Sequence, residues 1–409
     1  MTLRTYVIVR VLLTIPMIFI LLTTVFVVMR VLPGDPVQMH FEKMASPETM
    51  LQMRIQLGLD KPIWAQYFDY VVGLFRGDLG KSMQDYSSVG QQIFSAFPAT
   101  LELAICSMII AVSVGVFLGV ESSKSYNKPK DHVIRVFGIV TYAIPVFFLG
   151  MILQMIFGVW LHWLPTGGRI GPGLTPPGLN IPLSASSGFA AYFIAPSLAG
   201  LVLASIYLVA AKVKHKKFGR RVLAISLVFF AVGWAFFAGL GLYFMSSNRV
   251  HLSTGLFTVD SLLAGNLFSF GVSLKYLLLP SLTLGLVLCG IFIRLTRSNM
   301  FETMRLDFVT AAKARGLRDR TVTYRYAFRN AFLPVLTMMG LQFALLLGGA
   351  VLTEYTFSWP GLGRYLVDRI NFRDYTAIQG AVVVFGLFVS IVSLAVDLLY
   401  AYLDPRIRL

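Results

Sequence analysis

Long uncharged apolar windows alternate along the chain with short charged segments, and this alternation predicts membrane-spanning helices. A helix rises about 1.5 Å per residue, so crossing about 30 Å of hydrocarbon takes about 20 apolar residues. Eight windows meet this requirement: Val11–Met29, Leu103–Val120, Val136–Leu161, Phe189–Ala211, Val222–Met245, Tyr276–Ile293, Ala331–Leu352 and Tyr375–Val396. The pattern therefore predicts an all-α polytopic membrane protein with about eight transmembrane helices, because hydrocarbon offers no partner for other backbone conformations.

The windows divide the chain into segments. Residues 1–32 form a first transmembrane helix; basic residues precede its apolar stretch as in a signal peptide, but no small-residue cleavage pattern follows, so we expect it to be retained. Residues 33–98 form a small extracytoplasmic helical cap, 99–188 contain transmembrane helices 2 and 3 with an outer loop, and 189–245 contain a further helix pair. Residues 246–409 contain the remaining spans and a charged loop at 294–330.

The cap carries helix start and stop signals. Ser46-Pro47-Glu48 is a typical start, Leu57-Gly58 a typical stop, and Pro62 precedes a second helical run from Trp64 to Phe75. Trp64, Tyr67, Phe68 and Val71 recur every three or four residues, which predicts one apolar face. That face packs on the membrane domain or within the cap, or it is a direct surface for a partner.

Composition and charge agree with a membrane protein. Of 409 residues, 56% are hydrophobic and only 13% charged, and the formal net charge is +16. Most of the 35 Lys and Arg lie in the N-terminal segment, the 121–135 and 212–221 loops, the 294–330 loop and the C-terminal segment. This distribution follows the positive-inside rule and predicts that both termini are cytoplasmic. The basic residues therefore encode topology, and we expect membrane lipid, and no nucleic acid, as a partner.

Catalytic and metal-binding patterns are absent from the sequence. Gly80-Lys81-Ser82 resembles the end of a phosphate-binding loop, but Phe75 stands where that loop needs its first glycine. The five histidines have no metal-ligand spacing, and Cys106 and Cys289 lie inside predicted spans. Glu102, Glu354 and Asp397 lie near span ends, which does not support a proton pathway through the membrane. We therefore expect a non-enzyme with no cofactor and no metal of its own.

The 294–330 loop is too charged to span a membrane but joins two spans. Phe301, Met304, Phe308, Ala311 and Ala312 predict a helix with an apolar stripe, Gly316 a sharp turn, and Asp319 the cap of a second helix. Such a helix could lie on the bilayer surface. The small residues Ala311, Ala312, Ala314 and Gly316 favour the alternative, which is close approach of another protein.

At this loop the sequence resembles the permease subunits of ATP-binding-cassette (ABC) importers of the dipeptide/oligopeptide family. The resemblance extends from Asp307 to Leu317 and from Arg329 to Pro334. Further matches lie at Pro33–Pro36, Leu57–Asp60, Gly77–Gly80, Pro98–Glu102, Phe357–Arg364, Val396–Tyr400 and Asp404–Arg406. They occur in order at both ends of the chain.

The resemblance implies a six-helix permease core in a prokaryotic cell membrane, and the pair at 189–245 would be an insertion into it. It implies four kinds of partner: a second homologous permease subunit, two cytoplasmic ATPase subunits that bind ATP and Mg²⁺, an external solute-binding protein, and a cargo of peptides or related solutes such as oligosaccharides. By the same resemblance, the residues that couple to the ATPase are Asp307, Thr310, Ala311, Ala312, Ala314, Arg315, Gly316 and Leu317. Thr310 departs from the broader motif, which has Glu there. The alternative function is a secondary transporter that works alone.

Overall fold

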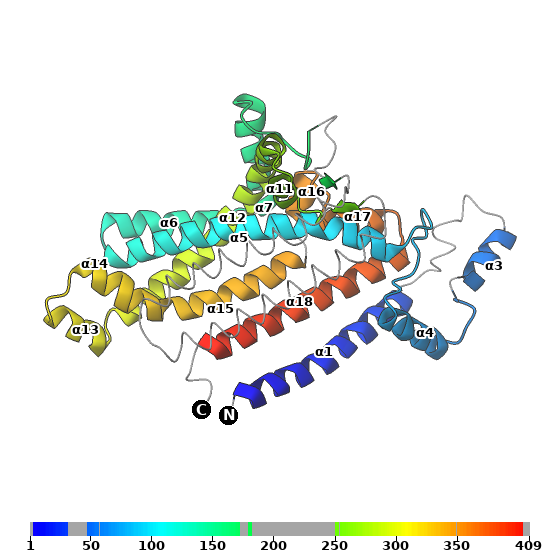
Figure 1. Ribbon diagram of the computed structural model, residues 1–409, viewed down its shortest axis with the longest axis horizontal. Helices are drawn as coiled ribbons and strands as arrows, with labels where there is room; N and C mark the ends of the chain where they lie inside the picture. Colours follow the sequence, from blue (N-terminus) through cyan, green and yellow to red (C-terminus); the bar gives the residue numbers. More distant parts are fainter. Residues whose placement is uncertain are drawn as a thin grey trace. The chain divides into compact units, whose positions relative to one another are not determined.

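The computed structural model describes residues 3–31, 47–56, 58–171, 179–181, 250–252, 254–348 and 350–403. The chain divides into two compact units, residues 1–174 together with 270–409, and residues 175–269. The first unit contains the long helices of Figure 1. The two units are described separately below.

The named elements of the first unit are all helices, joined by turns and short loops. Its elements are α1 (Leu3–Val31), α3 (Pro47–Gln56), α4 (Ile63–Phe75), α5 (Val89–Lys124), α6 (Pro129–Ala143), α7 (Val146–Leu153), η1 (Gln154–Trp160), α12 (Leu267–Thr303), α13 (Asp307–Ala314), α14 (Asp319–Thr321), η3 (Val322–Ala327), α15 (Phe328–Leu347), α16 (Val351–Thr356), α17 (Leu362–Asn371) and α18 (Tyr375–Leu403). The first three residues of α12 belong to the second unit.

Five helices in the described part of the chain are long and apolar enough to cross a membrane, within Leu12–Arg30, Val89–Lys124, Leu267–Thr303, Asp319–Leu347 and Tyr375–Val396. Each overlaps one predicted window, so the structure confirms a polytopic helical membrane protein. The windows Phe189–Ala211 and Val222–Met245 lie outside the described residues. The inserted pair therefore stays a prediction, as does the count of eight spans.

The third predicted window, Val136–Leu161, is a bent helix pair rather than one continuous helix. α6 ends at Ala143, and the chain bends by 102° before α7 begins at Val146. Pro145 lies at the break and is the N-cap of α7. Proline disfavours helical geometry in the residue before it, and Ile144 is extended. Because the window is apolar throughout, its hydropathy gives no sign of the bend.

The core of the first unit lies between α5, α12 and α15, where buried side chains such as Leu103, Met108, Phe292 and Val335 form one cluster. Close approach of α5 and α12 depends on glycine. A Cβ at Gly115 would collide with the Cβ of Phe292, and one at Gly119 would lie 2.6 Å from the Cβ of Thr296. α18 packs against α15 and also against α1, as Figure 1 shows.

The cap segment contains the two helices that its punctuation predicts. α3 begins at Pro47, and Gly58 turns the chain with a positive φ of 65° before Pro62 caps α4. Leu57 lies outside the described residues. α5 begins at Val89, ahead of residue 98 where we expected the cap to end, and Pro98 lies inside this helix.

The second unit contains the only strands in the described residues, which we did not expect in an all-α chain. β1 (Leu179–Ile181) and β2 (Val250–Leu252) pair antiparallel, with Asn180 opposite His251. α11 (Phe257–Leu263) follows, and Asp260 accepts hydrogen bonds from the backbone and hydroxyl of Thr254 at 2.9 and 2.6 Å. This contact fixes the turn that leads into α11.

The glycine contact between α5 and α12 makes a testable prediction. Gly115→Leu should lower the midpoint of thermal unfolding in detergent, because overpacking a core costs about 1–3 kcal/mol. Gly271→Leu is the matched control, since nothing lies within 4 Å of a Cβ at Gly271. Equal midpoints for the two variants would contradict the close approach of the two helices.

Candidate docking site

The loop between α12 and α15 is built as a short helix, a glycine turn and a second helix. α13 runs from Asp307 to Ala314 and ends at the C-cap Arg315. Gly316 then adopts a positive φ of 71°, a conformation that only glycine adopts without strain. The chain continues into α14, η3 and α15, and the predicted terminator is confirmed. Asp319 is the first residue of α14 rather than its cap, which is Arg318.

One face of α13 anchors it to the membrane domain. Val309 and Ala312 are buried in a cluster with Val120 of α5, Met300 of α12 and Val322 of η3. This differs from the predicted apolar stripe in one respect: Phe308 and Ala311 are exposed. The predicted stripe treats Phe301 to Ala312 as one helix. In the structure α12 ends at Thr303 and α13 begins at Asp307, so the two parts of the stripe lie on separate helices and point in different directions.

The exposed side of α13 carries small side chains together with Phe308 and Lys313. Of the residues predicted to contact a partner, Asp307, Thr310, Ala311, Ala314, Arg315 and Gly316 are exposed. Leu317 is half-buried against the anchoring cluster and Ala312 is inside it. The structure therefore brings all eight onto one loop, with Ala312 and Leu317 holding the loop and the other six facing outward. No contact with a partner is tested by this placement.

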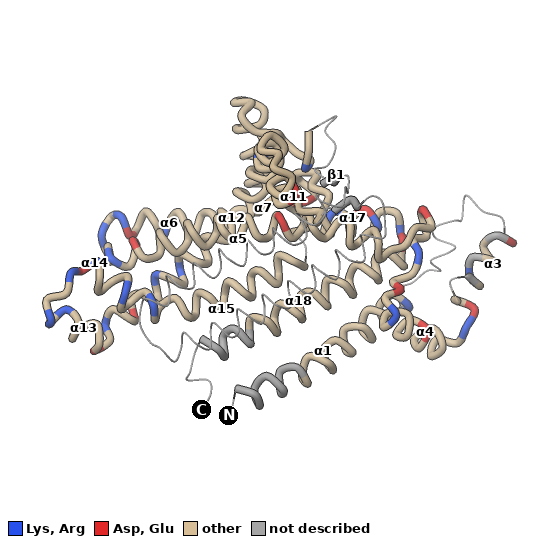
Figure 2. Tube along the Cα trace, viewed as in Figure 1, with Lys and Arg blue, Asp and Glu red and all other residues tan. Residues whose placement is uncertain are grey.

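Positive charge surrounds this exposed face. Arg305, Lys313, Arg315, Arg318 and Arg320 are all exposed, against the three exposed acids Glu302, Asp307 and Asp319. Figure 2 shows these basic positions together with those of the turn between α5 and α6, whereas the long stretches of the spans are uncharged. The face combines small side chains with a basic rim.

An ion pair between a buried carboxylate and a partly exposed arginine braces the same end of the bundle. Asp131, at the start of α6, is fully buried and accepts two hydrogen bonds from Arg297 of α12, at 2.8 and 2.9 Å. Ser122 of α5 and the backbone N–H of Asn127 donate to the same carboxylate, at 2.5 and 3.1 Å. A bidentate pair with its remaining lone pairs satisfied is the geometry in which a buried charge is tolerated.

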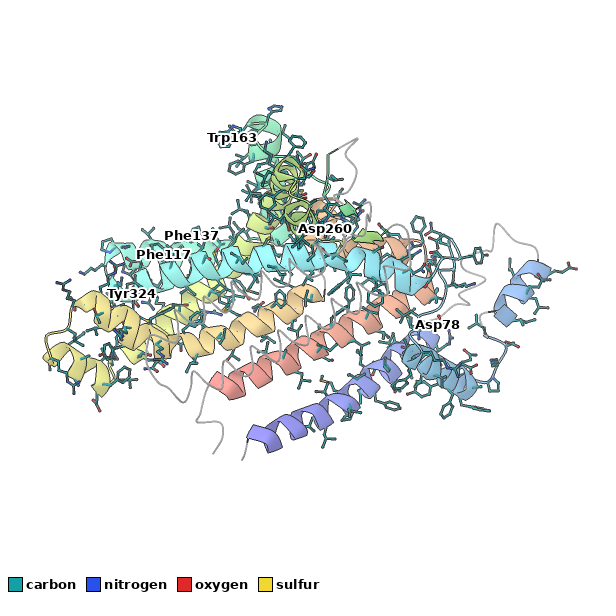
Figure 3. All side chains as sticks on the ribbon, viewed as in Figure 1. Asp78, Phe117, Phe137, Trp163, Asp260 and Tyr324 are labelled. Carbon is teal, nitrogen blue, oxygen red and sulfur yellow. The ribbon has the colours of Figure 1, made fainter. Side chains whose placement is uncertain are left out.

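Aromatic contacts connect this ion pair to the segments on either side of the loop from Asp307 to Leu317. Tyr126, in the turn between α5 and α6, stacks on Phe301 of α12 at 4.4 Å between ring centroids. The guanidinium of Arg305 lies over the Phe301 ring, 3.9 Å from its centroid. Lys124 donates a 3.0 Å hydrogen bond to the hydroxyl of Tyr324, which Figure 3 labels at this end of the bundle. The loop is therefore held from both sides.

A second polar network lies at the opposite end of α5. Glu102 and Arg169 form a buried ion pair at 2.6 Å, and the Arg169 guanidinium lies over the ring of Trp359, 5.6 Å from its centroid. Trp359 in turn donates from its indole nitrogen to the carbonyl of Ala99 at 2.9 Å. Residues that are far apart in the sequence thus meet around the start of α5.

Glu354 completes this network. Its buried carboxylate accepts from Thr100 at 2.7 Å and from the backbone N–H of Arg364 at 3.0 Å. A Cβ at Gly363 would lie 2.9 Å from this carboxylate, so the loop after Trp359 needs glycine to wrap around it. Burial raises the pKa of the Glu354 carboxyl, although these hydrogen bonds oppose the rise. The network joins α5, α16 and α17 at the end of the bundle opposite to the loop from Asp307 to Leu317.

Sequence reasoning had noted Glu102 and Glu354 only as acids near span ends, and had missed Asp131, Arg297 and Arg169. Their partners lie up to 254 residues away, so no local pattern pairs them. Among the described residues, no group of three His, Cys, Asp or Glu side chains is arranged to hold a metal ion.

Comparison with known proteins identifies two matching family profiles. Residues 111–409 match "Binding-protein-dependent transport system inner membrane component", and residues 3–104 match the profile of the corresponding N-terminal region. The dipeptide transport system permease protein DppB of Alkalihalophilus pseudofirmus is 32% identical over 98% of both chains. DppB of Escherichia coli is 34% identical over 95% of this chain and 93% of its own. The glutathione transport system permease protein GsiC of Salmonella choleraesuis is 31% identical over 98% of both chains.

The buried brace makes a testable prediction. Asp131→Asn should lower the midpoint of thermal unfolding, because it removes charge-assisted hydrogen bonds to the partly exposed Arg297, which are worth about 1.5–3 kcal/mol. Asp69→Asn, in the exposed pair with Lys61, is the control and should cost less than about 1 kcal/mol. Comparable midpoints would show that Asp131 does not hold α6 against α12.

Proposed function

The chain belongs to the family of inner-membrane components of binding-protein-dependent transport systems and is a permease subunit of an ABC importer, and we propose that the cargo of this importer is a peptide. Family membership removes the alternative of a secondary transporter that works alone. The relatives described above are named for transport of dipeptides and of glutathione, which is itself a tripeptide. Peptide cargo is therefore the substrate class that these relatives support.

We further propose that the loop from Asp307 to Leu317 docks into a separate ATPase subunit. The observation that supports this role is the exposed face of small side chains on α13, held by a buried face and ending at Gly316. Small residues permit close approach, and the basic rim fits an acidic partner surface. ATP and Mg²⁺ would be bound by that partner, not by this chain.

Coupling follows from the way the loop is mounted. ATP binding and hydrolysis would switch the ATPase pair between two states, and a docked α13 would follow that movement. Because Val309 and Ala312 pack on α5, α12 and η3, displacement of α13 would be transmitted to the spans. Access to the translocation pathway would then alternate between the two sides of the membrane. A second permease subunit would form the other half of the pathway, and an external solute-binding protein would deliver the cargo.

Orientation is part of the same proposal. The 294–330 loop, the 121–135 and 212–221 loops and the two terminal segments carry most of the basic residues, which favours the cytoplasmic side for them. The network of Glu102, Arg169 and Glu354 would then face the outside. α3 and α4 would form the extracytoplasmic cap of a multi-pass plasma-membrane protein.

The docking turn gives the first functional prediction. Gly316→Val forces a β-branched residue into a left-handed conformation, at a cost of about 1–2 kcal/mol. Nothing lies within 4 Å of the added Cβ, so assembly should persist. In proteoliposomes of the complete importer, transport per ATP hydrolysed should fall by about tenfold, the equivalent of about 1.4 kcal/mol.

The matched control is Gly316→Asn, since asparagine tolerates the left-handed conformation and should retain coupling. Normal coupling in Gly316→Val would contradict the assignment of the turn. Loss of the ATPase from the purified complex would instead locate the effect in assembly.

The cargo is tested by uptake of labelled dipeptide into the same proteoliposomes with the solute-binding protein present. We expect ATP-dependent uptake of the dipeptide and competition by unlabelled peptides, with an oligosaccharide as the control solute. Uptake of the oligosaccharide without uptake of peptide would contradict the proposed cargo and leave the docking proposal intact.

A further inference from the structure

α4 is an amphipathic helix with one face packed against α1. Tyr67 and Thr23 share a hydrogen bond of 2.7 Å between their hydroxyl oxygens. Tyr70 and Leu74 pack on the cluster formed by α1 and α18, and the ring of Tyr70 stacks on Phe26 at 5.6 Å between centroids. Of the predicted face, Tyr67 packs on the membrane domain, whereas Trp64 and Phe68 are exposed.

The contacts on α1 place α4 at bilayer depth. The span on α1 runs from Leu12 to Arg30. Tyr67 contacts the rings of Phe26 and Phe19 at 5.2 and 6.4 Å between centroids. At a rise of about 1.5 Å per residue, these two residues lie about 6 and 16 Å from the Arg30 end of the span. One face of α4 therefore lies beside the span, from near its Arg30 end to about its middle, and not beyond it.

A second face of α4 is apolar and uncovered by the described residues. The exposed fractions are 67% for Ile63, 68% for Trp64, 62% for Phe68, 44% for Val72 and 84% for Phe75. Trp64, Phe68, Val72 and Phe75 recur at spacings of three and four, so they line one side of the helix. In water, so many exposed large apolar side chains on one short helix would be costly.

The third side of α4 is polar and completes the pattern. Asp69 is exposed and forms an ion pair with Lys61 at 2.6 Å. Gln66 donates to the carbonyl of Lys61 at 2.7 Å. The helix therefore presents one side to α1, an apolar side next to it, and a polar side beyond. A helix lying at a membrane–water interface has this division between apolar and polar sides.

We propose that α4 is an interfacial helix whose face of Trp64, Phe68, Val72 and Phe75 contacts the lipid acyl chains of the leaflet that surrounds the Arg30 end of α1. Lipid is the occupant because this face continues the exposed apolar surface of α1, where Phe19, Ile20, Val27 and Val28 are also uncovered. Trp64 has the amphipathic ring that concentrates at membrane interfaces. α4 thereby anchors the cap to the bilayer.

Spin labelling of the complete importer in lipid nanodiscs tests this inference. Cys106→Ala and Cys289→Ala remove both thiols of this chain. Any accessible cysteines of the other subunits are replaced likewise, and the background is checked for ATPase activity. Single cysteines at Phe68 and Val72 report on the apolar face, and one at Asp69 is the matched control on the polar side. Relaxation by molecular oxygen, which partitions into lipid, is compared with relaxation by a water-soluble nickel chelate.

We expect the ratio of oxygen to nickel accessibility to be several-fold higher for labels at Phe68 and Val72 than for the label at Asp69. Access of the nickel chelate to Phe68 and Val72 equal to its access to Asp69 would place this face in water and overturn the proposal. Low accessibility to both reagents, with an immobilised spectrum, would show that another protein subunit covers the face and would overturn it equally.

Discussion

The hydrocarbon core of a membrane offers no hydrogen-bond partner to a peptide group, and this constraint decides where the chain can place its chemistry. Backbone groups are satisfied inside long helices, and charged side chains gather at the two ends of the bundle, as Figure 2 shows. Two buried carboxylates pair with arginines, Asp131 with Arg297 and Glu102 with Arg169. The buried Glu354 carboxyl is held instead by neutral donors, the Thr100 hydroxyl and backbone N–H groups. The exposed loop from Asp307 to Leu317 is supported at one of these ends.

α5 connects the two ends. Its N-terminal half carries Thr100, which accepts from the backbone N–H of Leu362, and Glu102, which pairs with the Arg169 that lies over Trp359. Its last turns carry Val120 and Ser122, which hold α13 and Asp131. The tight contact of α5 with α12 through Gly115 and Gly119 leaves little freedom between these points. Movement of the loop from Asp307 to Leu317 would therefore be transmitted through the packed pair of α5 and α12, as coupling between an ATPase and the spans requires.

Hydropathy predicted the five described spans because contact with lipid requires about 20 apolar residues in succession. Gly58, Pro62 and Gly316 predicted turns because the backbone preference of each residue acts locally. Sequence reasoning failed where the answer depends on tertiary structure. The 102° bend before α7 lies inside one continuous apolar window. The partner of Glu354 is Thr100, and the face of α4 predicted as one surface is divided between α1 and an uncovered side. Such pairings follow from the fold, not from spacing along the chain.

The central claim is that the exposed face of α13 contacts an ATPase, and site-specific photo-crosslinking in native membranes tests it most directly. A photoreactive amino acid at Ala314 lies on that face, whereas one at Leu345 of α15 is exposed on a predicted span. After irradiation, purification and mass spectrometry, the account predicts that Ala314 crosslinks to a subunit with nucleotide-binding motifs and that Leu345 does not. Crosslinks from Ala314 to lipid alone, or the same adduct from both positions, would contradict it.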